Sequence, residues 1–279
     1  MRKHLPPLFL SHGSPMTSVE PGAAGVFWQA LGPALRRVAQ RPRAILAISA
    51  HTLTREPVLM AAARHSTVHD FSGFPEALYR LRYDAPGAPA LAPQVLALLL
   101  AAGLPAHLSA EGGLDHGIWV PLRFAWPDAD IPVLPLAFPP DWSPARLHAL
   151  GRALAPLADD GVLVLGTGSI THNLRLVFGA NRPALDAPEI AECAAFRSWF
   201  ANRAAAGDSA ALLDYRRQAP HAALMHPSDE HLLPFFVAAG AAGAGAALRL
   251  HDSLTYGCLG MDAYAFGAGA DRLAQALVA

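Results

Sequence analysis

Short apolar runs alternate with helical patterns along most of this chain, and that alternation limits the folds open to it. The apolar runs, which predict strands, lie at residues 7–10, 44–49, 58–62, 131–138, 162–165 and 246–250. The helical patterns lie between them, at residues 24–40, 89–102, 144–158, 187–205 and 231–242. Strands that alternate with helices are typical of α/β proteins, in which helices flank a central sheet.

The predicted strands also lack the polar alternation of a half-exposed sheet. The run Ala44-Ile45-Leu46-Ala47-Ile48 is apolar throughout, which is typical of a strand buried on both faces. Proline and glycine (25 and 23 residues) are spread over the connections and do not gather in one linker. We therefore expect a single-domain α/β sandwich over residues 1–279, with a central, mostly parallel or mixed sheet and long loops at 64–88 and 109–130.

Composition excludes several classes of function. Lys3 is the only lysine, so the chain has no phosphate-loop lysine and is a poor candidate for Schiff-base chemistry. Its two cysteines, Cys193 and Cys258, lie far apart and cannot build a disulfide framework or a multi-cysteine zinc site. A net charge of −1 with 15% charged residues argues against nucleic-acid binding.

The apolar runs are also too short for membrane insertion or export. The first of them, Leu8-Phe9-Leu10, is shorter than the apolar region of a signal peptide. None reaches the roughly 20 residues that a membrane span needs. We therefore expect a soluble cytoplasmic protein with no membrane partner.

Histidine, by contrast, occurs 13 times, and several histidines follow predicted strands. His12, His51 and His172 come shortly after the runs that end at residues 10, 49 and 165. Because ligands gather at the carboxyl ends of parallel strands, we expect these imidazoles, and the active site, at that edge of the sheet. His231 lies in a turn before an apolar helix, and His116 lies in the second long loop. A metal site needs such convergence of ligands distant in sequence.

Other polar residues leave alternatives open. His226 competes with His231 as a ligand, although Pro227 favours a role for it in the turn. His65 and His69 either line a pocket or are solvated. Four carboxylates could complete a two-histidine, one-carboxylate iron site or orient an imidazole; they are Asp115, Asp229, Glu230 and Asp252.

The sequence lacks the motifs of nucleotide-binding and acyl-transfer enzymes. The stretch Gly166-Thr167-Gly168 begins like a dinucleotide fingerprint, but Thr171 stands where the third glycine belongs, so we predict no nucleotide-cofactor residues. The chain contains no Gly-x-Ser-x-Gly nucleophile elbow.

An ordered set of stretches does match a known family. The chain resembles the class III extradiol ring-cleaving dioxygenases, in the 4,5-DOPA dioxygenase-like branch of the LigB superfamily. The resemblance rests on residues 10–16, 49–51, 69–75, 83–87, 115–119, 171–174 and 227–231. These stretches follow one another in the family's order along the sequence, so the resemblance covers nearly the whole chain.

The resemblance implies a metal site. Its ligands would be His12, His51 and His231, with His172 as a fourth ligand or as the catalytic base. His116 would lie beside the substrate and dioxygen. The better-known relatives use a carboxylate where this chain has His231, and an all-imidazole site suits Zn²⁺ as well as Fe(II). We expect one divalent non-heme metal, with Fe(II) for activity and zinc possible in the isolated protein.

The resemblance also implies the reaction. A small aromatic diol, a catechol related to DOPA, would be opened with dioxygen to a muconic semialdehyde. Phe74 and Tyr256 are candidate substrate-binding residues, and Phe71 and Tyr79 could extend the aromatic wall. Arg80 and Arg82 could clamp a substrate carboxylate. Two alternatives stay open: a zinc-dependent hydrolase that uses the same histidines, and a non-catalytic metal-binding interaction protein. A homo-oligomer is compatible with the sequence.

Overall fold

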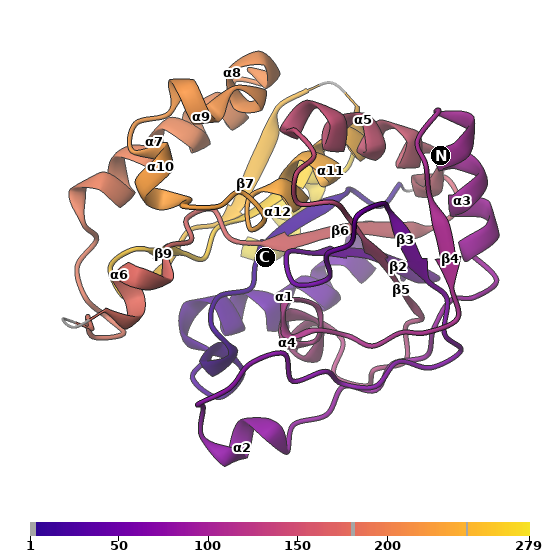
Figure 1. The fold of residues 1–279 in the computed structure, drawn as a ribbon, viewed down its shortest axis with the longest axis horizontal. Coiled ribbons are helices and arrows are strands. Elements are labelled where there is room, and N and C mark those ends of the chain that lie inside the picture. Colours follow the sequence, from indigo (N-terminus) through magenta and orange to yellow (C-terminus); the bar gives the residue numbers. More distant parts are fainter. Residues whose placement is uncertain (1–3, 180–181, 244) are drawn as a thin grey trace.

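The computed structural model describes residues 4–179, 182–243 and 245–279, so Lys3 lies outside the described residues. Eight strands form one sheet in the order β4-β3-β5-β2-β6-β1-β10-β7 (Figure 1). These strands are β1 (Leu8–Ser11), β2 (Ala44–Ser49), β3 (Val58–Met60), β4 (His107–Ser109), β5 (Val133–Ala137), β6 (Val162–Gly168), β7 (Ala247–His251) and β10 (Ala263–Phe266). A separate two-stranded ribbon joins β8 (Leu254–Thr255) to β9 (Leu259–Gly260).

The centre of the sheet is parallel and its flanks are mixed. Strands β5, β2, β6 and β1 run in the same direction, whereas β10 pairs antiparallel with β1 and β7, and β3 pairs antiparallel with β5. The α/β class and the mixed central sheet are thus confirmed. The four parallel strands end at one edge, and that edge positions the site.

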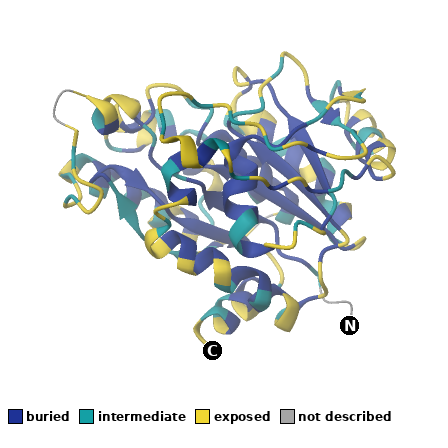
Figure 2. Cartoon of the chain, turned by 90° about the horizontal axis from the view of Figure 1, so that it is seen from below, coloured by how far each residue is buried: buried dark blue, intermediate teal, exposed yellow. Residues whose placement is uncertain are grey.

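Helices cover both faces of the sheet. One face packs against α1 (Gly22–Val38), α4 (His116–Ala125) and α12 (Ala270–Val278), and the other against α3 (Ala92–Ala101), α5 (Pro144–Leu154), α11 (Leu233–Ala242) and α7 (Ala191–Ala205). In β2, Ile45 and Ala47 pack in the core on the α1 side of the sheet. Leu46 and Ile48 pack in the core on the α11 side. Figure 2 shows the buried sheet between helices whose outer sides are exposed. The apolar run of β2 is therefore buried on both faces.

The remaining elements are short. They are α2 (Glu76–Tyr79), α6 (Leu174–Phe178), α8 (Ser209–Leu213), α9 (Tyr215–Gln218), α10 (Ala222–Met225) and the 3₁₀ turns η1 (Pro15–Ser18) and η2 (Ala155–Ala158). In the part of the chain that the structure describes, no helix combines the length and the apolar character needed to cross a bilayer.

The predicted loop at 109–130 is wrong, because it contains α4. Asp115 caps this helix by accepting a hydrogen bond from the Ile118 amide, so His116 is the first helical residue and not a loop residue. Gly117 and Pro121 interrupt the apolar pattern inside the helix, which hides it from a periodicity argument.

Candidate metal centre and active site

The parallel strands bring two predicted histidines together. Ser11 pairs with Gly168 and Ser49 pairs with Thr167, so β1, β2 and β6 end at nearly the same level. His12 follows β1 directly, and His51 lies two residues beyond β2. Their Nε2 atoms are 3.1 Å apart.

His231 reaches the same point from the other side of β6. Its Nε2 lies 3.3 Å from that of His51. The turn that carries it lies directly on the strand, and the Ser169 amide donates a hydrogen bond of 2.8 Å to the His231 carbonyl. A Cβ atom at Gly168 would come within 2.0 Å of that carbonyl oxygen. The second glycine of the failed nucleotide motif therefore serves this close approach.

The imidazoles of His12, His51 and His231 are each held by a hydrogen-bond partner at Nδ1. This leaves the lone pair of Nε2 free to bind a metal ion. The Thr167 hydroxyl donates to the Gly117 carbonyl (2.6 Å) and so accepts from His12 Nδ1 (2.9 Å). His51 Nδ1 lies 3.3 Å from the Asp70 carboxylate, and His231 Nδ1 lies 2.9 Å from Glu230. Such outer partners fix the tautomer and the ring orientation of metal-binding histidines.

The protonation state suits a metal as well. Burial, reinforced by the charges of the neighbouring histidines, lowers the pKa of His12 and of His231 well below the ordinary value. Burial followed by the charge of His116 lowers the pKa of His51 to about 3. All three rings are therefore neutral at neutral pH, which is the form that binds metal ions.

The spacing of the nitrogens fits a divalent ion. Metal–imidazole bonds of about 2.0–2.1 Å place neighbouring ligand nitrogens about 3.0–3.4 Å apart, and the two Nε2 separations, 3.1 and 3.3 Å, fall in that range. Other ligand atoms lie close by. One set within 4.8 Å of one another comes from His12, His51 and His116, and a second comes from His172, Glu230 and His231.

His172 lies against His231 at the edge of this cluster. The two rings stack with centroids 3.3 Å apart and planes 8° apart. Burial, followed by the charge of His226, lowers the pKa of His172 to about 3. His172 lines the cavity above the cluster, so this neutral imidazole faces the space that a substrate would occupy.

Asp70 joins His116 to His51. One carboxylate oxygen lies 2.9 Å from His116 Nδ1 and 3.3 Å from His51 Nδ1, and the other accepts the backbone N–H of His116 at 2.9 Å. Burial raises the pKa of Asp70, but the hydrogen bonds and charge of His116 outweigh it and lower the pKa to about 2. Asp70 is therefore an anion that orients two imidazoles at once.

A cavity of about 250 Å³ lies over these side chains. Four histidines and Asp70 line one part of it, and the wall is largely apolar, with Phe71, Phe74, Leu174, Val177 and Phe178. The Phe71 ring meets those of Phe74 and His116 edge-on, with centroids 5.4 and 5.8 Å away. The cavity, which we call the inner cavity, can hold a flat aromatic ring against the histidines.

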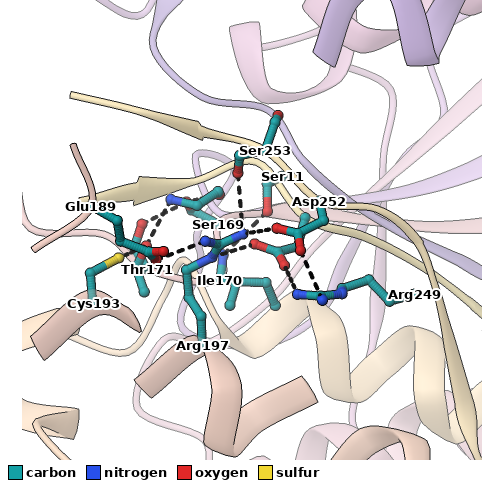
Figure 3. Close-up of polar contacts among 12 residues, drawn as sticks. Ser11, Ser169, Ile170, Thr171, Glu189, Cys193, Arg197, Arg249, Asp252 and Ser253 are labelled. Atoms are coloured by element: carbon teal, nitrogen blue, oxygen red, sulfur yellow. Dashed lines mark hydrogen bonds and ion pairs between the residues drawn. The ribbon is translucent and has the colours of Figure 1, made fainter. Parts of the chain in front are cut away.

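Polar contacts hold the residues directly before His172, as Figure 3 shows for Ser169, Ile170 and Thr171. The Ser11 hydroxyl accepts the Ile170 amide, and the Thr171 hydroxyl donates to the Cys258 carbonyl. Next to these contacts, the Arg197 guanidinium from α7 binds three carboxylates, those of Glu189, Asp252 and Asp262.

Several of the residues that the sequence offered for substrate or carboxylate roles lie away from the cavity and the clustered imidazoles. Phe74 lines the inner cavity, but Tyr256 is buried in the core and is not among the residues that line it. Asp115 binds Ser49 and Thr52 and caps α4, and so supports the site without facing the other ligands. Only Glu230 of the four carboxylates directly orients one of the three clustered imidazoles.

The other candidates have partners elsewhere. Asp229 binds Tyr215 and Arg216, and Asp252 binds Arg197. His226, His65 and His69 face backbone carbonyls, those of Ile170, Val133 and Leu81 in turn. Arg80 pairs with Glu76, and Arg82 binds the carbonyls of Tyr79 and Leu81.

Sequence reasoning missed Asp70 and Thr167 as partners of the histidines. Asp70 lies in a stretch that matches the family, but it contacts His116 from 46 positions away. Thr167 lies in the rejected nucleotide motif, and its partner His12 is 155 positions away. No local pattern reports contacts of this range.

Comparison with known proteins decides the family. The model of the catalytic LigB subunit of aromatic ring-opening dioxygenase matches residues 6–267. The chain belongs to the LigB family. The resemblance in the sequence is thereby confirmed. The protein is an extradiol aromatic ring-opening dioxygenase, and the family implies a non-heme metal.

Relatives of this LigB-family protein share most of its length. A Beta vulgaris protein named 4,5-DOPA dioxygenase extradiol is 36% identical over 266 residues, 92% of this chain and 95% of the relative. An Escherichia coli K12 protein of the same name is 45% identical over 175 residues, 62% of each chain. The crystal structure of an uncharacterized E. coli K12 protein is 29% identical, with a TM-score of 0.74 over 94% of this chain and 100% of that chain.

Proposed function

We propose that this LigB-family dioxygenase opens a DOPA-like catechol with dioxygen to a muconic semialdehyde, at a divalent metal held by His12, His51 and His231. The observation that carries the ligand assignment is the shared orientation of the three rings. Each is fixed at Nδ1 by an acceptor, and the Nε2 atoms lie toward one another beside the inner cavity. The names of the relatives support the choice of substrate.

The metal we propose for activity is Fe(II). When bound, Fe(II) supplies the redox chemistry that joins dioxygen to the ring, which the d¹⁰ ion Zn²⁺ does not supply. Three neutral imidazoles bind either ion, so zinc in the isolated protein would be compatible with this site.

The protein itself positions the substrate and moves protons. Phe71 and Phe74 hold the ring in the inner cavity. His172 takes a phenolic proton, because its imidazole lines that cavity within reach of a bound ring. His116 also lines that cavity, with Nδ1 bound to Asp70, which leaves Nε2 to accept a proton near the reacting oxygen.

Reconstitution tests this proposal. Metal-free protein is reloaded with Fe(II) or Zn²⁺ and supplied with catechols in air. A yellow ring-fission product with Fe(II) alone is the expected result. Ester or amide cleavage with Zn²⁺ and no ring opening would instead favour the hydrolase, and bound metal with no turnover of any substrate would favour a binding protein.

The role of His172 is tested by His172→Ala. Turnover should fall by about 10²–10⁴-fold, the usual contribution of a positioned proton acceptor. Metal content, measured by elemental analysis, should stay at the wild-type level. A parallel loss of metal would make His172 a fourth ligand.

We also propose that residues 1–279 form one catalytic domain. The cytoplasmic location and a homo-oligomeric state stay predictions, and size-exclusion chromatography with light scattering measures the second.

A further inference from the structure

A second hollow adjoins the inner cavity. It measures about 420 Å³ and shares Ser72, Phe74 and Phe178 with the inner cavity, so the two lie side by side. We call it the outer groove. A substituent on a ring bound at the histidines can extend into it.

The two hollows differ in charge. The wall of the inner cavity is largely apolar away from the histidines and Asp70. Among the described residues that line the outer groove, two carry a charge, Glu20 and Arg182. Neither takes part in an ion pair with another described residue. One acid and one base are therefore available to a ligand.

Arg182 is held in place by aromatic rings. Its guanidinium carbon lies 5.4 Å from the centroid of Phe178 and 5.8 Å from that of Tyr256. Phe178 lines both hollows, and Tyr256 is buried. Cation–π contacts of this kind favour a guanidinium beside the rings and leave its N–H groups free to bind a carboxylate.

We propose that Arg182 and Glu20 determine substrate specificity by binding the charged tail of an amino-acid catechol, Arg182 its carboxylate and Glu20 its ammonium group. This rests on the proposed function, since the ring must lie at the histidines for the tail to enter the groove. It also gives Tyr256 a role, as the residue that positions Arg182. Arg80 and Arg82, whose partners lie in their own loop, have no part in it.

Four substrates separate the two charges. They are L-DOPA, 3-(3,4-dihydroxyphenyl)propionate with only the carboxylate, dopamine with only the ammonium group, and 4-methylcatechol with neither. Arg182→Gln should lower kcat/KM about tenfold, through KM, for the first two. Glu20→Gln should do so for L-DOPA and dopamine. Turnover of 4-methylcatechol should change less than about twofold in both variants.

Arg80→Gln is the matched control, because it removes an exposed arginine that lines neither hollow. All four substrates should be unaffected by it. The proposal is overturned if Arg182→Gln lowers kcat/KM equally for all four substrates. It is also overturned if kcat/KM is unchanged for the two substrates that carry a carboxylate.

A binding measurement tests the role of Arg182 without depending on ring opening. L-Tyrosine lacks the second hydroxyl, and its affinity for the zinc-loaded protein is measured by calorimetry. Arg182→Gln should weaken binding about tenfold and Arg80→Gln should not. If the wild type opens no catechol, the proposed function fails while this comparison still decides the inference. Equal affinities, or no binding by the wild type, contradict it.

Discussion

Thr167 sets the tautomer of His12 with a single hydroxyl. It accepts from His12 Nδ1 while donating to the Gly117 carbonyl, and it is fully buried. Thr167→Val keeps the shape but removes this acceptor, so His12 loses the bond that presents Nε2. Metal affinity should fall by about 10- to 100-fold, the usual cost of losing an outer partner of a metal ligand.

Thr167→Ser retains the hydroxyl and should keep affinity within a few-fold of wild type, which makes it the matched control. Titration with Zn²⁺ against a competing chelator measures both variants. Equal affinities of the valine and serine variants would show that the Thr167 hydroxyl does not orient His12.

Asp70 acts on two imidazoles, so its charge matters more than its size. In the wild type, the two oxygens of the Asp70 carboxylate face three N–H groups: the His116 amide, His116 Nδ1 and His51 Nδ1. In Asp70→Asn the amide offers these groups a single acceptor oxygen. We expect kcat/KM to fall by about 10- to 100-fold. Steady-state kinetics on the iron-loaded enzyme measures the loss, and Glu76→Gln, an exposed change in the nearby helix α2, should leave kcat/KM unchanged. Wild-type rates in Asp70→Asn would rule out this orienting role.

Among the strands and helices, an unbroken buried run such as β2 is predicted from the sequence. The exposed strand β4 and contacts between distant residues are not. Strand β2 is predicted with its correct bounds because all six residues are buried, which leaves an unbroken apolar run. The positions of His12 and His51 are predicted for the same reason, because the ends of the apolar runs mark the ends of β1 and β2. The short strand β4 is missed because its residues are partly exposed, with Leu108 at 45%.

Strand β10 lies in the sheet through pairing with β1 and β7, and its four-residue run is not distinctive by itself. The partners of the histidines are hidden for a related reason. The fold alone brings Asp70 and Thr167 to rings far away in the chain.

Arg197 ties α7 to the segment after β9. Its side chain is 7% exposed and binds Asp262, which is 1% exposed, at 2.9 Å. Arg197→Met leaves that buried carboxylate with Arg249 alone, so we expect a loss of about 3–5 kcal/mol in unfolding free energy. Arg203→Met, in the same helix, breaks a largely exposed pair with Asp208 and should cost less than about 1 kcal/mol. Urea denaturation measures both, and similar small losses would contradict the importance of the buried network.

The whole molecule should lose stability in mild acid when it holds no metal. Burial lowers the pKa of several histidines in the fold, to about 3 for His51 and His172 and about 4 for His226. In the unfolded chain these groups titrate near 6.5. Below that pH the unfolded state therefore binds more protons than the native state, and the unfolding free energy falls as pH falls toward the folded-state pKa values.

Each such histidine contributes up to about 1.4 kcal/mol per pH unit within this window. We expect metal-free protein to be at least about 2 kcal/mol less stable at pH 5.5 than at pH 7.5, as measured by urea denaturation. The surface substitution His107→Gln should leave that difference unchanged. Saturating Zn²⁺ should raise stability at pH 7.5, because an ion that binds only the native state stabilises it, and should do so less at pH 5.5, where protons compete for the same nitrogens. Equal stability of the metal-free protein at the two pH values would mean that these imidazoles are not buried as neutral groups in the fold.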